Sequence, residues 1–393
     1  MLAAVLALIP AAAALAMPLT WLCRQIGLRA KALDTAPIPG QQKAPPPPRP
    51  TPNTGGIALY LSIALPLLAA TLAVSLAPGL LTSLVPALSE HLTGLRDQIP
   101  NLIIFLVCLT AVHILGLIDD RRPLGPYLKL GIMIGAATSV VWLTDTRLLT
   151  ALDGMTGSPI PSILITVLWI VVITNAMNFM DNMDGLTAGV AAIAGSCFMA
   201  AALAHDRPQW FIAACLALLV GACLGFLVFN FPLRRAGRAS IFMGDGGSLV
   251  LGFTLAFLTV RTTYVEPTSV VTASTLATST HWYGVLMPLL VMAVPLYDFA
   301  SVCLIRLRAG KSPFVGDLNH LSHRLVKRGL TKRDAVLVIY GLTAVTAIGG
   351  IALAGLKPWQ AMLVGVQTLL ALMVLAVYEG RNELPHDDSR LRR

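Results

Sequence analysis

Charged residues are scarce in this sequence. Asp, Glu, Lys and Arg make up 12% of the 393 residues, whereas soluble globular domains carry about 25%. Hydrophobic residues make up 56%, and the mean hydropathy is +0.77. A soluble protein of this length could not bury so much apolar surface. The composition therefore predicts an all-α polytopic integral membrane protein.

Cysteine patterning is also absent. The six cysteines lie mostly inside apolar runs, and none stands in a Cys-x-x-Cys or Cys/His metal spacing. We interpret them as small buried hydrophobic residues, which excludes a disulfide framework. The net charge of +9 would suit nucleic acid in a soluble protein. In a membrane protein an excess of Lys and Arg more often marks cytoplasmic loops, so we expect the lipid bilayer, and no nucleic acid, as partner.

Hydropathy predicts about eleven membrane spans. They cover residues 1–22, 55–77, 102–118, 128–143, 160–174, 186–203, 210–229, 248–260, 282–304, 335–356 and 358–377. No basic residue precedes Arg24, as the start of a signal peptide would require, and this favours an uncleaved first span. We expect one transmembrane catalytic domain over 1–380, with a Pro-rich cytoplasmic linker at 23–54 and a cytoplasmic His/Arg loop at 306–333. A basic cytoplasmic tail follows at 381–393.

The distribution of positive charge gives the orientation. With eleven spans, 23 of the 28 Lys and Arg residues fall on one side. Because cytoplasmic loops are enriched in Lys and Arg, that side is predicted to be cytoplasmic, with the N-terminus outside and the C-terminus inside. The acidic clusters Asp119-Asp120, 175–184 and Asp245, and the His-rich segment 320–324, all fall on this same side.

Carboxylates gathered at a membrane face beside Arg and Lys suit a Mg²⁺–polyphosphate, because Mg²⁺ prefers oxygen ligands and substrate phosphates. Glycines around Asp245 would let the backbone approach a phosphate at the start of a helix; a helix-capping turn is the alternative. Asp119 and Asp120 point about 100° apart on a helix, so one could contact substrate while the other orients it or acts as base. A solvated pair balanced by Arg121 and Arg122 would be the structural alternative.

Four motifs together resemble the polyprenyl-phosphate N-acetylhexosamine-1-phosphate transferase superfamily, which is glycosyltransferase family 4-like. They are Gly-Leu-Ile-Asp-Asp (116–120), Asn-Ala-Met-Asn-Phe-Met-Asp-Asn-Met-Asp-Gly-Leu (175–186), Phe-Met-Gly-Asp-Gly-Gly-Ser-Leu-Val-Leu-Gly-Phe (242–253) and His-Leu-Ser-His-Arg-Leu (320–325). The last motif resembles the bacterial branch that uses UDP-GlcNAc and primes O-antigen, teichoic-acid or related surface glycans. The chain departs from the family pattern in three places: Asn182 replaces a glycine, Ser322 replaces a histidine, and the proline run before Gly55-Gly56 replaces a segment of basic residues and histidine.

The resemblance implies transfer of a sugar-1-phosphate, expected to be GlcNAc-1-phosphate, from a UDP-sugar to undecaprenyl phosphate, with release of UMP. It implies Mg²⁺, with Mn²⁺ as an alternative, held by Asn178, Asp181 and Asp245. Asp119, Asp120 and Asp181 would be catalytic. It also implies an active site on the cytoplasmic face of a bacterial inner membrane, and a homodimer, for which no stretch of the sequence predicts an interface.

The remaining expected site residues bind substrate. They are Lys129, Asn175, Asp184, His320, His323 and Arg324. Lys129 could instead be an interfacial lysine, and the His segment a basic loop that meets lipid headgroups. Two other functions stay open: the peptidoglycan branch, which transfers phospho-MurNAc-pentapeptide, and a secondary transporter for an anionic metabolite.

Overall fold

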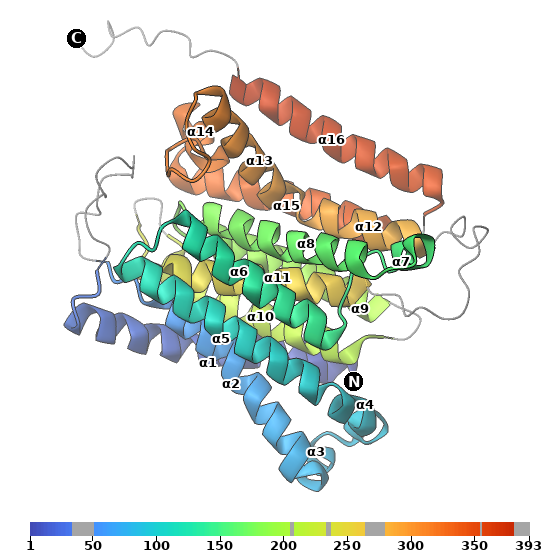
Figure 1. The fold of residues 1–393 in the computed structure, drawn as a ribbon. Coiled ribbons are helices and arrows are strands. Elements are labelled where there is room, and N and C mark those ends of the chain that lie inside the picture. The colour runs from blue at the N-terminus through green and yellow to red at the C-terminus, as the bar shows by residue number, and fades with distance from the viewer. Residues whose placement is uncertain (34–50, 205–207, 233–236, 264–279, 354–355, 381–393) are drawn as a thin grey trace, which may run out of the picture.

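The computed structural model describes residues 1–33, 51–204, 208–232, 237–263, 280–353 and 356–380. Within these ranges the fold is helical, and the only β-type pairing is an isolated bridge between Leu33 and Pro52. The helices run roughly parallel or antiparallel across one bundle (Figure 1). The prediction of an all-α protein is confirmed.

Ten of the described helices are long and apolar enough to cross a membrane. They are α1 (Leu2–Arg29), α2 (Gly55–Leu76), α5 (Ile99–Arg121), α6 (Pro126–Thr144), α8 (Ile160–Phe179), α9 (Leu186–Ala204), α10 (Trp210–Asn230), α11 (Gly244–Thr263), α15 (Lys332–Ala352) and α16 (Pro358–Gly380). Shorter helices connect them: α3 (Pro78–Leu84), η1 (Pro86–His91), α4 (Leu92–Asp97), α7 (Ala151–Thr156) and α14 (Leu321–Lys327). The chain is a multi-pass membrane protein.

The predicted span at 282–304 is broken in two. It forms α12 (Thr280–Val291) and α13 (Ala293–Arg308), and the backbone departs from helical geometry at Met292 (φ −95°, ψ 14°), although the Met292 N–H still donates to the carbonyl of Pro288 and its carbonyl accepts from Leu296. Pro295 explains this departure. It has no N–H to donate to the carbonyl of Val291, and its ring crowds that carbonyl. The described residues thus hold ten candidate spans against the predicted eleven or so, and the remaining predicted span corresponds to the pair α12 and α13.

Two predicted segment boundaries differ from the structure. Helix α1 continues to Arg29, into the expected Pro-rich linker 23–54, whose first proline is Pro37. Residues 34–50 of that linker and the tail 381–393 lie outside the described residues. The predicted loop 306–333 contains the end of α13 and all of α14. The predicted division into one catalytic domain and a tail stays a prediction.

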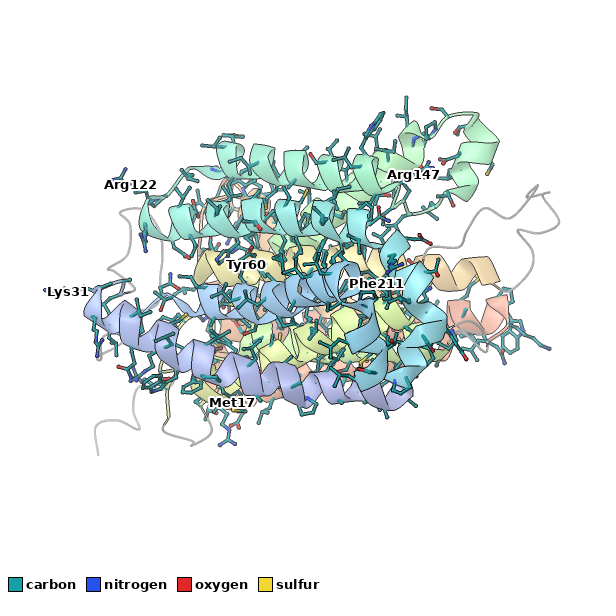
Figure 2. All side chains as sticks on the ribbon, turned by 90° about the horizontal axis from the view of Figure 1, so that it is seen from below. Met17, Lys31, Tyr60, Arg122, Arg147 and Phe211 are labelled. Atoms are coloured by element: carbon teal, nitrogen blue, oxygen red, sulfur yellow. The ribbon has the colours of Figure 1, made fainter. Side chains whose placement is uncertain are left out.

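Helix α11 lies at the centre of the bundle and is almost wholly buried, in contact with α2, α5, α8 and α9. Helix α16 lies at the periphery (Figure 1) and exposes most of its apolar side chains, as a lipid-facing helix should. The predicted assignment of basic residues to opposite membrane sides agrees with the bundle's geometry. Lys31 and Arg122 lie at one end and Arg147 at the other (Figure 2). The site residues gather at the end marked by Lys31 and Arg122.

Candidate active site

Lys129 is the centre of the polar cluster. It lies on the first turn of α6, and its ammonium contacts Asp119 Oδ2 at 3.2 Å, Asn178 Oδ1 at 3.4 Å and Asp245 Oδ2. These three partners come from the ends of α5, α8 and α11. Their convergence explains why the polar residues interrupt three separate apolar runs. The side chains of Lys129, Asp119 and Asp245 keep 15%, 19% and 28% of their surface exposed, so a ligand can reach them.

Asp120 binds to the start of α11. Its Oδ1 accepts hydrogen bonds from the backbone N–H of Asp245 (2.9 Å) and from Asn53 Nδ2 (3.0 Å), and its Oδ2 accepts from the N–H of Gly246 (3.2 Å). A carboxylate is stabilised at a helix N-terminus because the first N–H groups have no partner within the helix. Asp120 thus connects α5, α11 and the segment before α2.

The glycines around Asp245 serve close packing. A Cβ at Gly116 would lie 2.5 Å from Asp245 C and Gly246 N, and one at Gly56 would lie 2.4 Å from Gly247 N. Gly244 has a φ of +62°, which an L side chain rarely adopts. The sequence suggested that these glycines cradle a phosphate. In the structure they bring α2, α5 and α11 together, and Asp120 occupies the helix N-terminus.

The end of α8 supplies the amides. Asn178 Nδ2 donates to Asp245 Oδ1 and to Ser248 Oγ, both at 2.9 Å, so Asn178 faces Lys129 and Asp245 together. Asn175, one turn earlier, donates to the carbonyl of Val171 at 2.8 Å and therefore lies along the helix rather than in the cluster. Asp181 follows α8, and its backbone N–H donates to the carbonyl of Asn178.

Asp184 stabilises the loop between α8 and α9. Its Oδ2 accepts from the backbone N–H of Ala239 at 2.8 Å. Burial raises the pKa of the Asp184 carboxyl, and the hydrogen bond from Ala239 and the charges of Lys332 and Arg238 oppose this. Gly185, with a φ of +79°, donates its N–H to Asn230 Oδ1 at 2.9 Å. The loop is thus anchored to the segment that precedes α11.

The histidine segment is held from behind by Asp298. This buried carboxylate on α13 contacts His320 Nδ1 at 3.0 Å and accepts from the N–H of Leu321 at 2.6 Å. His323 lies one turn further along α14. Burial, and then electrostatic interactions with His320, Lys332 and Lys327, lower the pKa of His323 to about 4, so this side chain is neutral at pH 7.

Arg324 is engaged by protein partners. Its Nε donates to Glu379 Oε2 at 2.7 Å, one terminal nitrogen donates to Ser301 Oγ at 2.8 Å, and the other to the carbonyl of Asn319. Arg324, which lies on α14, therefore links this helix to α13 and to the end of α16. Its predicted contact with substrate phosphates stays a prediction.

Sequence reasoning missed three residues of this site: Asn53, Ser248 and Asp298. Asn53 and Ser248 carry no signal without knowledge of the fold, because their partners are far away in sequence. Asp298 had one. An ionisable residue inside an apolar run is functional by default, and Asp298 interrupts the predicted span at 282–304.

The oxygen atoms around Lys129 are of the kind that hold a divalent cation. The carboxylates of Asp119 and Asp245 and the amide oxygen of Asn178 converge on one positive charge, and Mg²⁺ prefers such ligands. Within the described ranges, no three His, Cys, Asp or Glu side chains form a metal-binding group by themselves. The ammonium of Lys129 takes the place of a cation among these oxygens, and so the residues present fit Mg²⁺ with substrate oxygens completing the shell.

The fold and the site together define a polytopic membrane protein with an ionic cluster at one end of its bundle. A family model described as glycosyl transferase family 4 matches residues 102–263, which include the cluster's Asp119, Lys129, Asn178 and Asp245. The chain belongs to this family, in the branch of polyprenyl-phosphate N-acetylglucosamine phosphotransferases.

Three relatives illustrate the similarity. The chain is 33% identical to a decaprenyl-phosphate N-acetylglucosaminephosphotransferase of Mycolicibacterium smegmatis, over 84% of this chain and 78% of the relative. It is 30% identical to a probable undecaprenyl-phosphate N-acetylglucosaminyl 1-phosphate transferase of Bacillus subtilis, over 68% and 70%. It is 29% identical to an undecaprenyl-phosphate alpha-N-acetylglucosaminyl 1-phosphate transferase of Escherichia coli, over 66% and 68%. The predicted superfamily and branch are confirmed.

Proposed function

We propose that this protein transfers GlcNAc-1-phosphate from UDP-GlcNAc to undecaprenyl or decaprenyl phosphate and releases UMP. The observation that carries the proposal is the convergence of Asp119, Asn178 and Asp245 on Lys129 at one end of a membrane bundle. The names of the relatives supply the sugar and the lipid. A multi-pass enzyme suits an acceptor that is itself embedded in the bilayer.

In the proposed reaction an oxygen of the lipid phosphate attacks the β-phosphorus of the donor. The bond between that phosphorus and the bridging oxygen breaks, and UMP leaves with the electron pair. A phosphate monoester has its second pKa near about 6, so the acceptor needs little deprotonation at pH 7. Lys129 is proposed to bind the donor diphosphate, because its ammonium is the positive charge at the centre of the cluster and stays partly exposed.

The geometry distinguishes the two adjacent carboxylates. Both oxygens of Asp120 are occupied by N–H groups of α11 and by Asn53, so Asp120 positions Asp245. Asp119 contacts Lys129 and the N–H of Leu124 (2.9 Å) and keeps partial exposure. We therefore assign the contact with the lipid phosphate, and any base role, to Asp119. His320, His323 and Arg324 are proposed to border the substrate phosphates.

Asn178, Asp181 and Asp245 are proposed to hold Mg²⁺, with Mn²⁺ as a substitute. When bound, the ion would neutralise charge that develops on the departing UMP. The excess of Lys and Arg in the segments predicted to lie on the same membrane side as the site supports a cytoplasmic active site. The membrane is proposed to be the plasma membrane of a bacterium.

The test is UMP release by the purified chain from a panel of UDP-sugars, with undecaprenyl phosphate and Mg²⁺. We expect turnover with UDP-GlcNAc that requires both the lipid and the metal. Preference for UDP-MurNAc-pentapeptide would assign the chain to the peptidoglycan branch. Uptake of an anionic metabolite into vesicles, without UMP release from any donor, would overturn the proposal in favour of a transporter.

A further inference from the structure

Two of the places at which this chain departs from the family pattern, Asn182 and Ser322, are in direct contact. Ser322 Oγ donates a hydrogen bond to Asn182 Oδ1, across 140 positions of sequence. Asn182 Nδ2 in turn donates to the carbonyl of Phe179 at 2.8 Å. Ser322 is buried, with 1% of its surface exposed. The two departures therefore belong to one structural feature.

This contact joins two parts of the proposed site. Asn182 lies in the loop that carries Asp181, directly after α8, and Ser322 lies on the first turn of α14, between the two histidines. Asp298 holds the same turn from the α13 side. The α14 turn is thus fixed between α13 and the carboxylate loop.

Aromatic packing adds to this contact. The ring of Phe179 meets the ring of His320 edge-on, with centroids 5.8 Å apart and planes at 84°. Because Asn182 binds the carbonyl of Phe179, its side chain also fixes the residue that packs on His320. A change at Asn182 would therefore alter two contacts with the histidine segment: the hydrogen bond from Ser322, and the position of Phe179 against His320.

The side chains at the two positions are reciprocal in size. The resemblance to the family implies glycine, with no side chain, at 182 and the large imidazole at 322, whereas this chain has the larger amide at 182 and the small hydroxyl at 322. Glycine at 182 alone would leave the buried Ser322 hydroxyl without its acceptor, which is unfavourable. Histidine at 322 alone would crowd the Asn182 amide in a packed interior.

We propose that Asn182 and Ser322 form a matched positioning pair, which fixes the histidines of α14 relative to the Asp181 loop and so determines the KM for the UDP-sugar. Neither residue is assigned a contact with substrate. The kinetic part of this inference rests on the proposed function. The residue at one position determines which residue the other position accepts.

The test compares Asn182→Gly, Ser322→His and the double variant N182G/S322H in the purified full-length chain. We expect each single change to raise the KM for UDP-GlcNAc by about tenfold or more, because small displacements of binding groups are costly. The double variant should return to within about threefold of the wild-type KM, which is the signature of coupled positions. Ser196→Ala is the control, since it removes a hydroxyl that binds only the Ala192 carbonyl of its own helix; its KM should not change.

Two results would overturn the inference. The first is a double variant whose KM is at least as impaired as the product of the single changes. The second is a lowered Tm with an unchanged KM in both single variants, which would make the pair merely structural. If the wild-type chain releases no UMP, the proposed function fails by itself. A cycle of Tm values for the same variants then decides the pair: recovery in the double variant supports it, and additive losses reject it.

Discussion

At the scale of single residues, the site depends on charges that compensate one another. Lys129 is surrounded by the oxygens of Asp119, Asn178 and Asp245, and each charge would be costly at a membrane boundary without the others. The role of Asp245 in particular is testable, because asparagine has the same shape without the charge.

We expect Asp245→Asn to lower kcat for UMP release by about a hundredfold or more, the typical effect of losing a group that stabilises transition-state charge. The measurement is UMP release at saturating UDP-GlcNAc over a Mg²⁺ titration. Asp153→Asn is the matched control. Asp153 pairs with Arg147, at the opposite end of the bundle from the site, so this variant should keep the wild-type kcat. Near-normal turnover by the Asp245 variant would refute the assignment of this carboxylate.

His323 should make the protein less stable in acid. Its pKa is about 4 in the folded protein, against an ordinary value of 6.5. Between these values the unfolded chain binds a proton that the folded chain does not bind. The contribution of His323 to stability is therefore complete above pH 6.5 and decreases as the pH falls toward 4.

We expect Tm measured in detergent to fall between pH 7 and pH 5, and His323→Gln to reduce that fall. The expected difference is on the order of 1 kcal/mol at pH 5, after allowance for the partial exposure of the ring. Equal Tm shifts in the variant and the wild type would contradict a neutral His323.

At the scale of helices, glycines determine how closely the polar ends of neighbouring helices approach one another. Gly116 on α5 contacts the backbone at the start of α11 so closely that a methyl group would lie 2.5 Å from two backbone atoms. By contrast, nothing lies within 4 Å of a Cβ built at Gly135 on α6.

Gly116→Ala should therefore displace α11, with a loss of about 1–3 kcal/mol of stability and a fall of about tenfold or more in kcat as Asp245 moves from Lys129. Gly135→Ala makes the same chemical change and should raise Tm, because alanine is favoured over glycine in a helix by about 1 kcal/mol. Thermal unfolding and UMP release on both variants provide the comparison; equal effects would show that the α5–α11 contact is not limiting.

At the scale of the whole molecule, the site lies at the end of the bundle that Lys31 and Arg122 mark (Figure 2). Sealed inside-out membrane vesicles should release UMP from added UDP-GlcNAc, because their cytoplasmic face is outward. Right-side-out vesicles should do so only after detergent is added. Equal activity in both sealed preparations would contradict the orientation derived from the Lys and Arg count.

Hydropathy and charge were enough to predict the helical architecture and the shared end of the acidic clusters, because both properties are local. The partners of individual side chains were not predictable in this way. The sequence leaves open which of Asp119 and Asp120 contacts substrate, and it gives no sign that Asp120 binds the N–H groups of Asp245 and Gly246, 125 and 126 positions away. Pro295 is a sequence signal for the irregular backbone at Met292, but hydropathy alone does not show it because the apolar run continues through both residues.

The hydrogen bonds of Asp120 also bear on how the protein is made. Helix α5 is synthesised long before α11, so the Asp120 carboxylate waits without its backbone donors until the chain beyond Gly246 has been inserted. The site is therefore completed late in biogenesis, when α11 enters the centre of the bundle. A chain that terminates before Gly244 would retain Asp119, Lys129 and Asn178 but would leave the Asp120 carboxylate without its two backbone donors, with Asn53 as its remaining partner. Such a fragment should be recognised as unfinished and removed by membrane proteases, while the full-length chain persists.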